Sequence, residues 1–437
     1  GKDLLKFSPF WPFYDHSTLL CGRSTATALA GFSEFINDRL DQGHQILALF
    51  IDYKKAFDTL DHEVLLQAMD DCGIRGPTNM WFRTYLSNRT IQTSIAGTTG
   101  REAGVALGVP TGSVFGPVGY IMHVNSVANV VKNCQVYMYA DDMCLLYSSK
   151  NILEARAVIQ EDFINITKWA HDNGIILNGH TYECLHSNYI SCNCQNIEYV
   201  KTFKYLGLWV DSHANWRTHV DTVCTKLRSV LSKFYVLKAP LSRKTLRIVY
   251  FALVESLIGY GLSVYGRTFK TYLDNIKALQ IRFLKYLVPP KVKRECKHNY
   301  DKLYIPCKVL PVHDRAKYFL ILEQFYSHQN KEKVTNKYNT RRVRENKLVR
   351  PPCKNYYGSR TNKYLIPTIY NKNDWLRHIN TKINKQSLKN KLRNIKQIKD
   401  FIIIMYVLYI ITGPQGPGPL EGVRGAEANS QRPVEQF

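Results

Sequence analysis

Tyr139-Ala140-Asp141-Asp142 is the stretch of sequence that decides the fold of this chain. It stands between two apolar runs, 136–138 and 143–146, a pattern that predicts a strand, a tight turn and a second strand. Two adjacent carboxylates at a bend repel each other, so we expect a cation beside them, and a divalent metal ion is the natural candidate. An ordinary turn is the alternative for an isolated Asp-Asp pair, since Asp favours turns.

A third carboxylate supports the metal hypothesis. Residues 46–51 form a continuous apolar run that predicts a buried strand, and this run ends at Asp52. Two metal ions held about 3.5–4 Å apart by such carboxylates would activate a 3′-hydroxyl and stabilise a leaving pyrophosphate. We therefore predict Asp52, Asp141 and Asp142 as catalytic residues and metal ligands.

Three segments follow one another in a characteristic order and spacing. They are Phe50-Ile-Asp-Tyr-Lys-Lys-Ala-Phe-Asp58, Gly108-Val-Pro-Thr-Gly-Ser-Val-Phe-Gly-Pro117 and Tyr139-Ala-Asp-Asp142. Together they resemble the palm motifs of reverse transcriptases. Their residues are most similar to those of non-LTR (LINE-type) retrotransposons. The resemblance extends over residues 15–400 and includes Tyr205-Leu-Gly-Leu-Trp-Val-Asp211.

The resemblance implies a right-hand polymerase of the α+β class, with fingers, an antiparallel palm sheet and a helical thumb. We expect partial fingers in residues 1–45, the palm with finger insertions in 46–212, a helical thumb in 213–290, a basic C-terminal region in 291–400, and an apolar stretch with a disordered tail in 401–437.

Local patterns predict the elements of this fold. We expect helices near 61–72, with Asp58 and Asp61 as caps, and near 81–86. A strand is expected at 90–95, a glycine-started helix at 111–131 and a helix at 152–173. Hairpins are expected at 135–147 and 203–211, and two or three helical segments over 216–288.

The same resemblance implies a reaction: extension of a DNA 3′-end on an RNA template, using deoxynucleoside triphosphates and Mg²⁺ (or Mn²⁺). Asp52 and Asp141 would ligate both metal ions with help from Asp142, and the carbonyl of Tyr53 is a further ligand. Phe57 stands in the steric-gate position, where a bulky ring clashes with a ribose 2′-hydroxyl. A core aromatic is the alternative for Phe57.

Further residues take binding roles by resemblance. Arg23 stands where the family has a basic residue near the incoming triphosphate, with a surface Arg as the alternative. Gly112 and Ser113 belong to a loop that leads into a helix, where backbone amides suit phosphate or base contacts. The hairpin of 203–211 implies a primer grip formed by Tyr205, Leu206 and Gly207.

Two departures from the family pattern leave a second hypothesis open. Thr111 stands where the family has a Gln that contacts the nascent base pair, and Thr181 where it has a Lys that can protonate pyrophosphate. Threonine cannot replace that general acid. The alternative is therefore a catalytically decayed nucleic-acid-binding remnant. A domesticated or telomerase-like polymerase is a third hypothesis. The residues of the motifs argue against it, because they resemble those of retrotransposons.

Positive charge is concentrated in residues 291–400, which hold 28 Lys and Arg against 8 Asp and Glu, a net charge of +20. Such a block attracts phosphate backbones and gives salt-dependent binding. Aromatic residues interleave with it and could stack on bases: Tyr356, Tyr357, Tyr364, Tyr370 and Trp375. A solvated, partly disordered extension is the alternative.

Cysteine usage and hydropathy bear on location. Eleven cysteines without a secretory signal indicate an intracellular protein of the cytoplasm and nucleus, not a secreted one. The apolar run 401–412 is shorter than the ~20 residues that cross a bilayer, so we expect no stable membrane association.

The chain begins at Gly1 without Met, so we expect a fragment of a longer protein.

Overall fold

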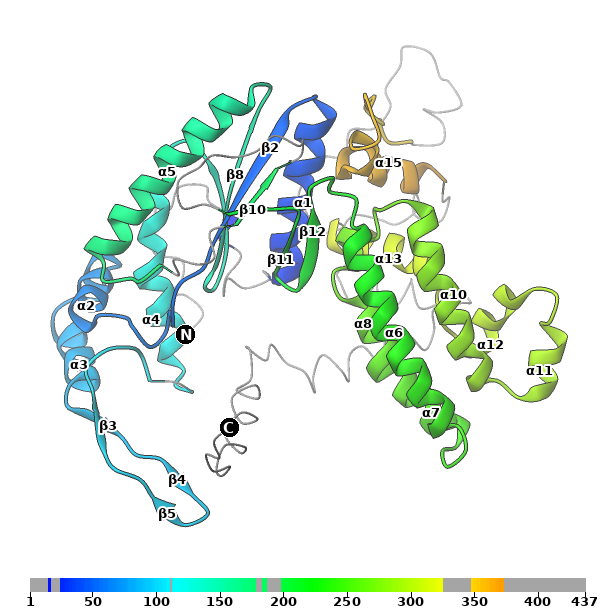
Figure 1. Cartoon of the computed structure of the whole chain (residues 1–437), viewed down its shortest axis with the longest axis horizontal. Coiled ribbons are helices and arrows are strands. Elements are labelled where there is room, and N and C mark those ends of the chain that lie inside the picture. Colours follow the sequence, from blue (N-terminus) through cyan, green and yellow to red (C-terminus); the bar gives the residue numbers. More distant parts are fainter. Residues whose placement is uncertain are drawn as a thin grey trace, which may run out of the picture.

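A six-stranded sheet forms the centre of the computed structural model, which describes residues 15–16, 24–110, 112–177, 183–186, 198–324 and 347–372 (Figure 1). Its order is β1-β7-β8-β2-β9-β10, with the central strands β7, β8, β2 and β9 antiparallel. The fold is α+β, which confirms the predicted class. The strands are β1 (Asp15–His16), β2 (Gln45–Ile51), β7 (Gln135–Tyr139), β8 (Asp142–Ser149), β9 (Glu183–His186) and β10 (Glu198–Val200).

Alternate residues of β2 enter two different cores, because successive side chains of a strand point to opposite faces. Leu47, Leu49 and Ile51 pack with α2 (His62–Asp71), α4 (Phe115–Val124) and α5 (Ile152–Asp172). Ala48 and Phe50 pack with α1 (Thr25–Asp41) and with the hairpin of β11 (Thr202–Tyr205) and β12 (Leu208–Asp211). The sheet is thus covered on both faces, as the continuous apolar run of 46–51 predicted.

The start of α2 follows from one side chain. The Asp61 carboxylate accepts the backbone N–H groups of Glu63 and Val64, which confirms its predicted capping role. Asp58 does not cap this helix, so that prediction was wrong. Its N–H donates to the carbonyl of Lys55 in a local turn, three residues before the capping position.

Two other predicted elements are shorter than expected. The glycine-started helix begins only at Phe115, and after Val124 it continues as the 3-10 turn η1 (Asn125–Asn129). The predicted strand 90–95 is divided into β3 (Arg89–Ile91) and β4 (Ser94–Ile95), which pair with β6 (Ala103–Val105) and β5 (Thr98–Thr99). These strands form a narrow arm beyond α3 (Pro77–Leu86) (Figure 1).

Residues 217–324 form a second, helical lobe beside the sheet (Figure 1). Two or three helical segments were predicted over 216–288. There α7, η2 and α8 follow one another without a break, short turns separate the other helices, and further helices continue to residue 324. The helices of the lobe are α6 (Arg217–Leu237), α7 (Arg243–Val249), the π-helix η2 (Tyr250–Glu255), α8 (Ser256–Gly259), α9 (Leu262–Tyr265), α10 (Lys270–Leu287), α11 (Pro290–Glu295), η3 (Tyr300–Leu303), α12 (Tyr304–Cys307) and α13 (Val312–Gln324).

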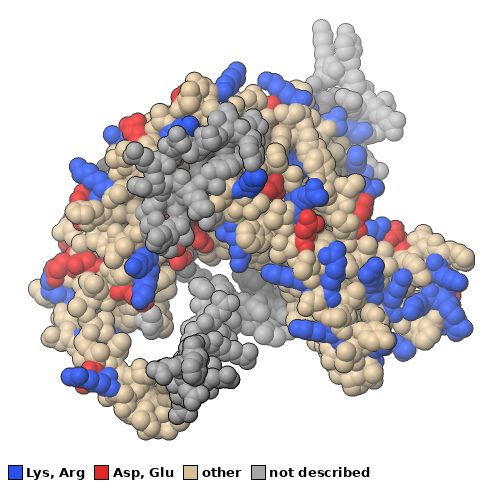
Figure 2. All heavy atoms as spheres, viewed as in Figure 1, with Lys and Arg blue, Asp and Glu red and all other residues tan. Residues whose placement is uncertain are grey.

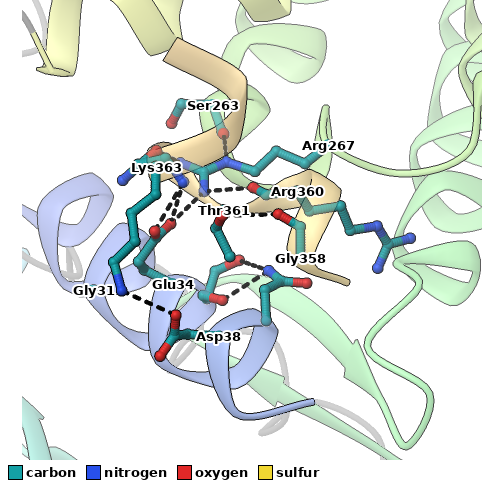
Figure 3. A network of polar contacts seen from close by, with 12 residues as sticks. Gly31, Glu34, Asp38, Ser263, Arg267, Gly358, Arg360, Thr361 and Lys363 are labelled. Atoms are coloured by element: carbon teal, nitrogen blue, oxygen red, sulfur yellow. Dashed lines mark hydrogen bonds and ion pairs between the residues drawn. The ribbon is translucent and has the colours of Figure 1, made fainter. Parts of the chain in front are cut away.

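Part of the basic region is fixed against both lobes. Glu34 of α1 forms an ion pair with Arg267 at 3.0 Å and accepts the backbone N–H of Asn362 at 2.8 Å (Figure 3). Arg267 also donates to the side chain of Asn362 at 2.8 Å. We call residues 354–363 the C-terminal clamp; they include η4 (Gly358–Arg360) and the start of α15 (Asn362–Lys372). For this segment, the alternative of a solvated, disordered extension was wrong.

The clamp also contains a predicted stacking residue. Tyr356 stacks on Phe269, with ring centres 4.1 Å apart, and the guanidinium of Arg360 lies 4.0 Å from its ring centre. One face of its ring is thus occupied within the protein, but the side chain is only half-buried, so stacking of Tyr356 on bases stays a prediction. Tyr370 is half-buried in a small apolar cluster, and Trp375 lies outside the described residues.

In the described part of the chain, no helix combines the length and the apolar character that a bilayer span needs. The apolar run 401–412 lies outside the described residues.

Stability should depend on pH through His219. Its Nδ1 accepts the N–H of Trp209, and burial, with a smaller effect of Lys226, lowers its pKa to about 4. The unfolded value is near 6.5, so the folded state binds fewer protons between these values and loses stability as pH falls from 6.5 to 4. This loss should be about 1.4 kcal/mol per pH unit.

Urea denaturation between pH 7 and pH 4.5 measures the effect. His219→Gln should flatten the acid slope, because Gln can accept the same N–H without titrating. The control is His171→Gln, at an exposed position, which should keep the wild-type slope. An unchanged slope in His219→Gln would contradict the assignment.

Candidate active site

The register of β2 against β8 places two of the predicted carboxylates opposite each other. The strands are antiparallel, and Ile51 pairs with Met143. Asp52 follows Ile51 and Asp142 precedes Met143, so these two residues face each other at the end of the sheet. Directly opposed residues of an antiparallel pair point to the same face. The structure therefore brings Asp52 and Asp142 together, as predicted from two segments about ninety residues apart.

The third carboxylate is placed by the turn between β7 and β8. Tyr139 pairs with Asp142, so Ala140 and Asp141 are the only two turn residues. Ala140 has a φ of +56°, in the left-handed region, which costs an L-residue about 1–2 kcal/mol. This tight turn holds Asp141 beside Asp142 at the sheet end.

The electrostatics of the carboxylates agree with this proximity. Partial loss of hydration, with the neighbouring charges of Asp141 and Asp52, raises the pKa of Asp142 to about 6. Loss of hydration and the charge of Asp52 also raise the pKa of Asp141, while its own backbone N–H opposes the shift. In the part of the chain that the structure describes, no Lys or Arg pairs with Asp141 or Asp142. A bound cation would relieve this repulsion.

The donor set fits a divalent cation without forming a closed cage. Among the described residues, no three His, Cys, Asp or Glu side chains are already arranged around one metal position. Mg²⁺ commonly takes only one or two protein carboxylates and completes its shell with waters and substrate phosphates. Asp52, Asp141 and Asp142 could hold metal ions in this way once a nucleotide is present.

Tyr53 is oriented by a short contact with the segment around Leu177 of the same chain. It forms an antiparallel bridge with Leu177, and the flanking Lys54 donates its N–H to Ile176 at 2.9 Å. In this type of bridge the central residues direct their own carbonyls away from the partner. The Tyr53 hydroxyl is buried and contacts the sulfur of Met143 at 3.1 Å. Metal ligation by the Tyr53 carbonyl stays a prediction.

Phe57 lies on α4. Its half-buried ring packs against Tyr120 with 4.5 Å between ring centres. The ring is therefore held in place by Tyr120 of α4. This arrangement is compatible with both a core aromatic and a steric gate. The steric-gate role stays a prediction.

The loop before α4 docks against the segment that follows Asp52. Gly108 donates its N–H to Leu60 at 2.7 Å, and its carbonyl contacts Nε2 of His62 at 2.8 Å. Gly112 is exposed with a φ of +81°, and the Ser113 hydroxyl accepts the N–H of Gly116 at 2.9 Å. Ser113 thus stabilises the start of α4. Nucleotide contacts of Gly112 and Ser113 stay predictions.

The predicted primer grip is a tight hairpin turn packed between the two lobes. Leu206 and Gly207 both have positive φ, +45° and +80°, as a type I′ turn requires. The Tyr205 hydroxyl donates to the carbonyl of Tyr137 at 3.3 Å, and the Leu206 carbonyl accepts from Tyr260 at 2.7 Å. The side chains of Tyr205 and Leu206 are buried, so the predicted primer contact would fall to exposed Gly207 and the backbone.

Residues 14–210 match the family model described as "Reverse transcriptase (RNA-dependent DNA polymerase)". This range contains all three carboxylates and both strands that carry them. The curated matches to the jockey, X-element and R1 mobile elements agree with this match. Together they confirm the resemblance to non-LTR reverse transcriptases that was drawn from the motifs.

Its curated relatives come from insect mobile elements. The RNA-directed DNA polymerase from mobile element jockey of Drosophila melanogaster is 25% identical over 272 residues, 57% of this chain and 29% of the relative. The probable RNA-directed DNA polymerase from transposon X-element of the same species is 26% identical over 278 residues, 59% of this chain and 30% of the relative. The chain spans under a third of the length of these relatives.

Solved structures of telomerase share a weaker similarity. Apo telomerase from Candida tropicalis aligns with a TM-score of 0.38 at 10% identity, over 71% of this chain and 54% of that one. Telomerase from Candida albicans with a fragment of telomeric RNA aligns with a TM-score of 0.32 at 13% identity, over 75% and 54% of the two chains.

Not every predicted residue of the reverse transcriptase domain can be placed. Arg23, Thr111 and Thr181 lie outside the described residues. Conversely, Tyr120 was missed by the sequence interpretation, although its hydroxyl is buried without a partner among the described residues and the charges of all three carboxylates help to raise its pKa. No sequence signal marks it, because a Tyr in an apolar helix is indistinguishable from an ordinary core residue.

Gly108 should be irreplaceable in this domain. It has a φ of +83°, and a Cβ there would lie 2.7 Å from the Asp58 carbonyl oxygen and 2.8 Å from that of Phe57. Both contacts are to backbone, so Gly108→Ala must displace the segment that follows Asp52. We expect a loss of about 3 kcal/mol in the free energy of unfolding, from left-handed strain plus overpacking.

The matched control is Gly97→Ala, where φ is +85° and no atom lies within 4 Å of the added Cβ. It should lose only about 1 kcal/mol, the conformational cost alone. Urea denaturation of both variants measures the difference, and equal losses would contradict the docking of this loop.

Proposed function

We propose that this chain is an RNA-directed DNA polymerase that extends a DNA 3′-end on an RNA template with deoxynucleoside triphosphates. The observation that carries the proposal is the β2–β8 register, which sets Asp52 opposite Asp142 within a reverse transcriptase domain. The curated relatives that bear this activity in their names support it.

The three carboxylates share one role in the proposed mechanism, which is to bind metal ions. Asp52, Asp141 and Asp142 would hold divalent cations, Mg²⁺ or Mn²⁺, between β2 and the β7–β8 turn. When bound, two such ions activate the attacking 3′-hydroxyl and stabilise the leaving pyrophosphate. Phe57, supported by Tyr120, would exclude a 2′-hydroxyl and so select deoxynucleotides.

An intracellular location in cytoplasm and nucleus is part of the same proposal.

Primer extension tests the proposal directly. Purified chain should extend a DNA primer on an RNA template with Mg²⁺, and Asp141→Asn should lower the rate by about 1000-fold, since metal stabilisation of the transition state is several kcal/mol. Asp172→Asn, at the exposed end of α5, is the charge-matched control and should extend normally.

The decayed-remnant hypothesis makes a different prediction for the same assay. Salt-sensitive template binding without extension, in wild type and Asp141→Asn alike, would overturn the polymerase proposal. The Thr111 and Thr181 departures would then explain the loss of turnover.

The helical lobe offers a surface for the template and primer backbones. Segments 233–247 and 282–298 hold eleven Lys and Arg against one Glu, and Lys and Arg gather over this lobe in Figure 2. A groove between them is lined by Lys238, Arg243, Lys285 and Lys293 together with Tyr286. We propose that this lobe is the thumb and that its groove contacts phosphates.

Salt dependence measures that contact. Replacing two phosphate-contacting lysines in Lys238→Gln/Lys293→Gln should reduce the slope of log K against log salt by about 1.4–1.8, or 0.7–0.9 per lost contact. The control is Lys150→Gln/Lys168→Gln, on exposed positions of the sheet lobe. Identical slopes in the two double variants would exclude the groove as a binding surface.

A further inference from the structure

One polar group close to the carboxylates has no assigned role. Tyr120 lies on α4 and is only 2% exposed. Its hydroxyl oxygen is buried and has no hydrogen-bond partner among the described residues. A buried hydroxyl without a partner is costly, and native structures avoid it unless a ligand, a water or a moving side chain supplies the partner.

The surroundings of this hydroxyl identify the acceptors within reach. The Tyr120 ring packs against Phe57, which belongs to the segment that follows Asp52. After burial and Tyr53, the strongest influences that raise the Tyr120 pKa are the charges of Asp141, Asp52 and Asp142, in that order. The Tyr53 hydroxyl donates its proton to the Met143 sulfur, and the carboxylates are the charged acceptors in this region. Hydrogen bonds to a charged acceptor are the stronger ones.

The position of Asp141 makes it the best acceptor of the three. Asp52 and Asp142 point to the sheet face that packs with α1 and the β11–β12 hairpin, whereas α4 lies on the other face. Asp141 is a turn residue beyond the end of the β7–β8 ladder, so strand alternation does not hold its side chain to the face of Asp52 and Asp142.

We propose that Tyr120 is a positioning residue of the metal site, whose hydroxyl donates a hydrogen bond to the Asp141 carboxylate when a divalent cation is bound. The donated bond would fix which oxygen of Asp141 faces the metal, and would disperse charge on the other. This inference rests on the proposed function, because it needs the carboxylates to bind metal.

Metal binding without nucleic acid tests it. Mn²⁺ binding to the full chain is followed by electron paramagnetic resonance of the free ion. Tyr120→Phe should weaken Mn²⁺ binding about tenfold, the lower end of the effect of removing an outer-shell partner. Its thermal midpoint should equal or exceed that of the wild type, because the variant no longer buries an unpaired hydroxyl.

Two further variants separate the possible outcomes. Asp141→Asn should abolish the tight Mn²⁺ site. If this variant binds Mn²⁺ like the wild type, the metal site and the proposed function are overturned together. Tyr265→Phe removes an equally buried hydroxyl, which donates to the Ile258 carbonyl in the helical lobe, and should leave Mn²⁺ affinity unchanged.

If Asp141→Asn abolishes binding while Tyr120→Phe binds Mn²⁺ like the wild type, the metal site stands and the role of Tyr120 is overturned. A fall in thermal midpoint with unchanged affinity would likewise assign Tyr120 to the apolar core alone. Only loss of affinity with retained stability supports the proposal.

Discussion

The antiparallel register between β2 and β8 is the constraint on which the site depends. A slip of one residue would turn Asp52 to the opposite face and would exchange the two sets of apolar side chains on β2. Leu47, Leu49 and Ile51 fit one core, while Ala48 and Phe50 fit the other, so such a slip is strongly opposed. The carboxylates are therefore positioned by apolar packing several residues away from them.

This arrangement matters because the carboxylates themselves repel one another. Their raised pKa values show that the folded protein holds Asp141 and Asp142 in an environment that disfavours their charge. The sheet compensates through its two cores. The stack of Phe50 on Phe203, with 4.0 Å between ring centres, also fixes the β11–β12 hairpin to the face toward which Asp52 points. Metal ligands and the predicted primer grip thus share one face of the sheet.

Local patterns made much of this predictable. The apolar runs around Asp52 and Asp141 indicated strands because both faces of those strands are buried, and Asp61 indicated a helix start through its capping chemistry. The clamp was not predictable, because its contacts join residues such as Glu34 and Asn362, which are 328 positions apart. Composition was misleading there: Arg360 contributes to a basic region, yet only 2% of its surface is exposed.

The clamp also explains how the helical lobe is oriented relative to the carboxylates. Apolar contacts between helices allow sliding, whereas hydrogen bonds and ion pairs fix direction and distance. Arg267 of the helical lobe bonds Glu34 of α1 and Asn362 of the clamp, and Tyr260 bonds the Leu206 carbonyl beside the sheet. A buried ion pair adds little net stability but can specify one geometry. These directional contacts lie where the lobe meets the sheet, so they set the direction in which its basic far end extends from Asp52 and Asp142.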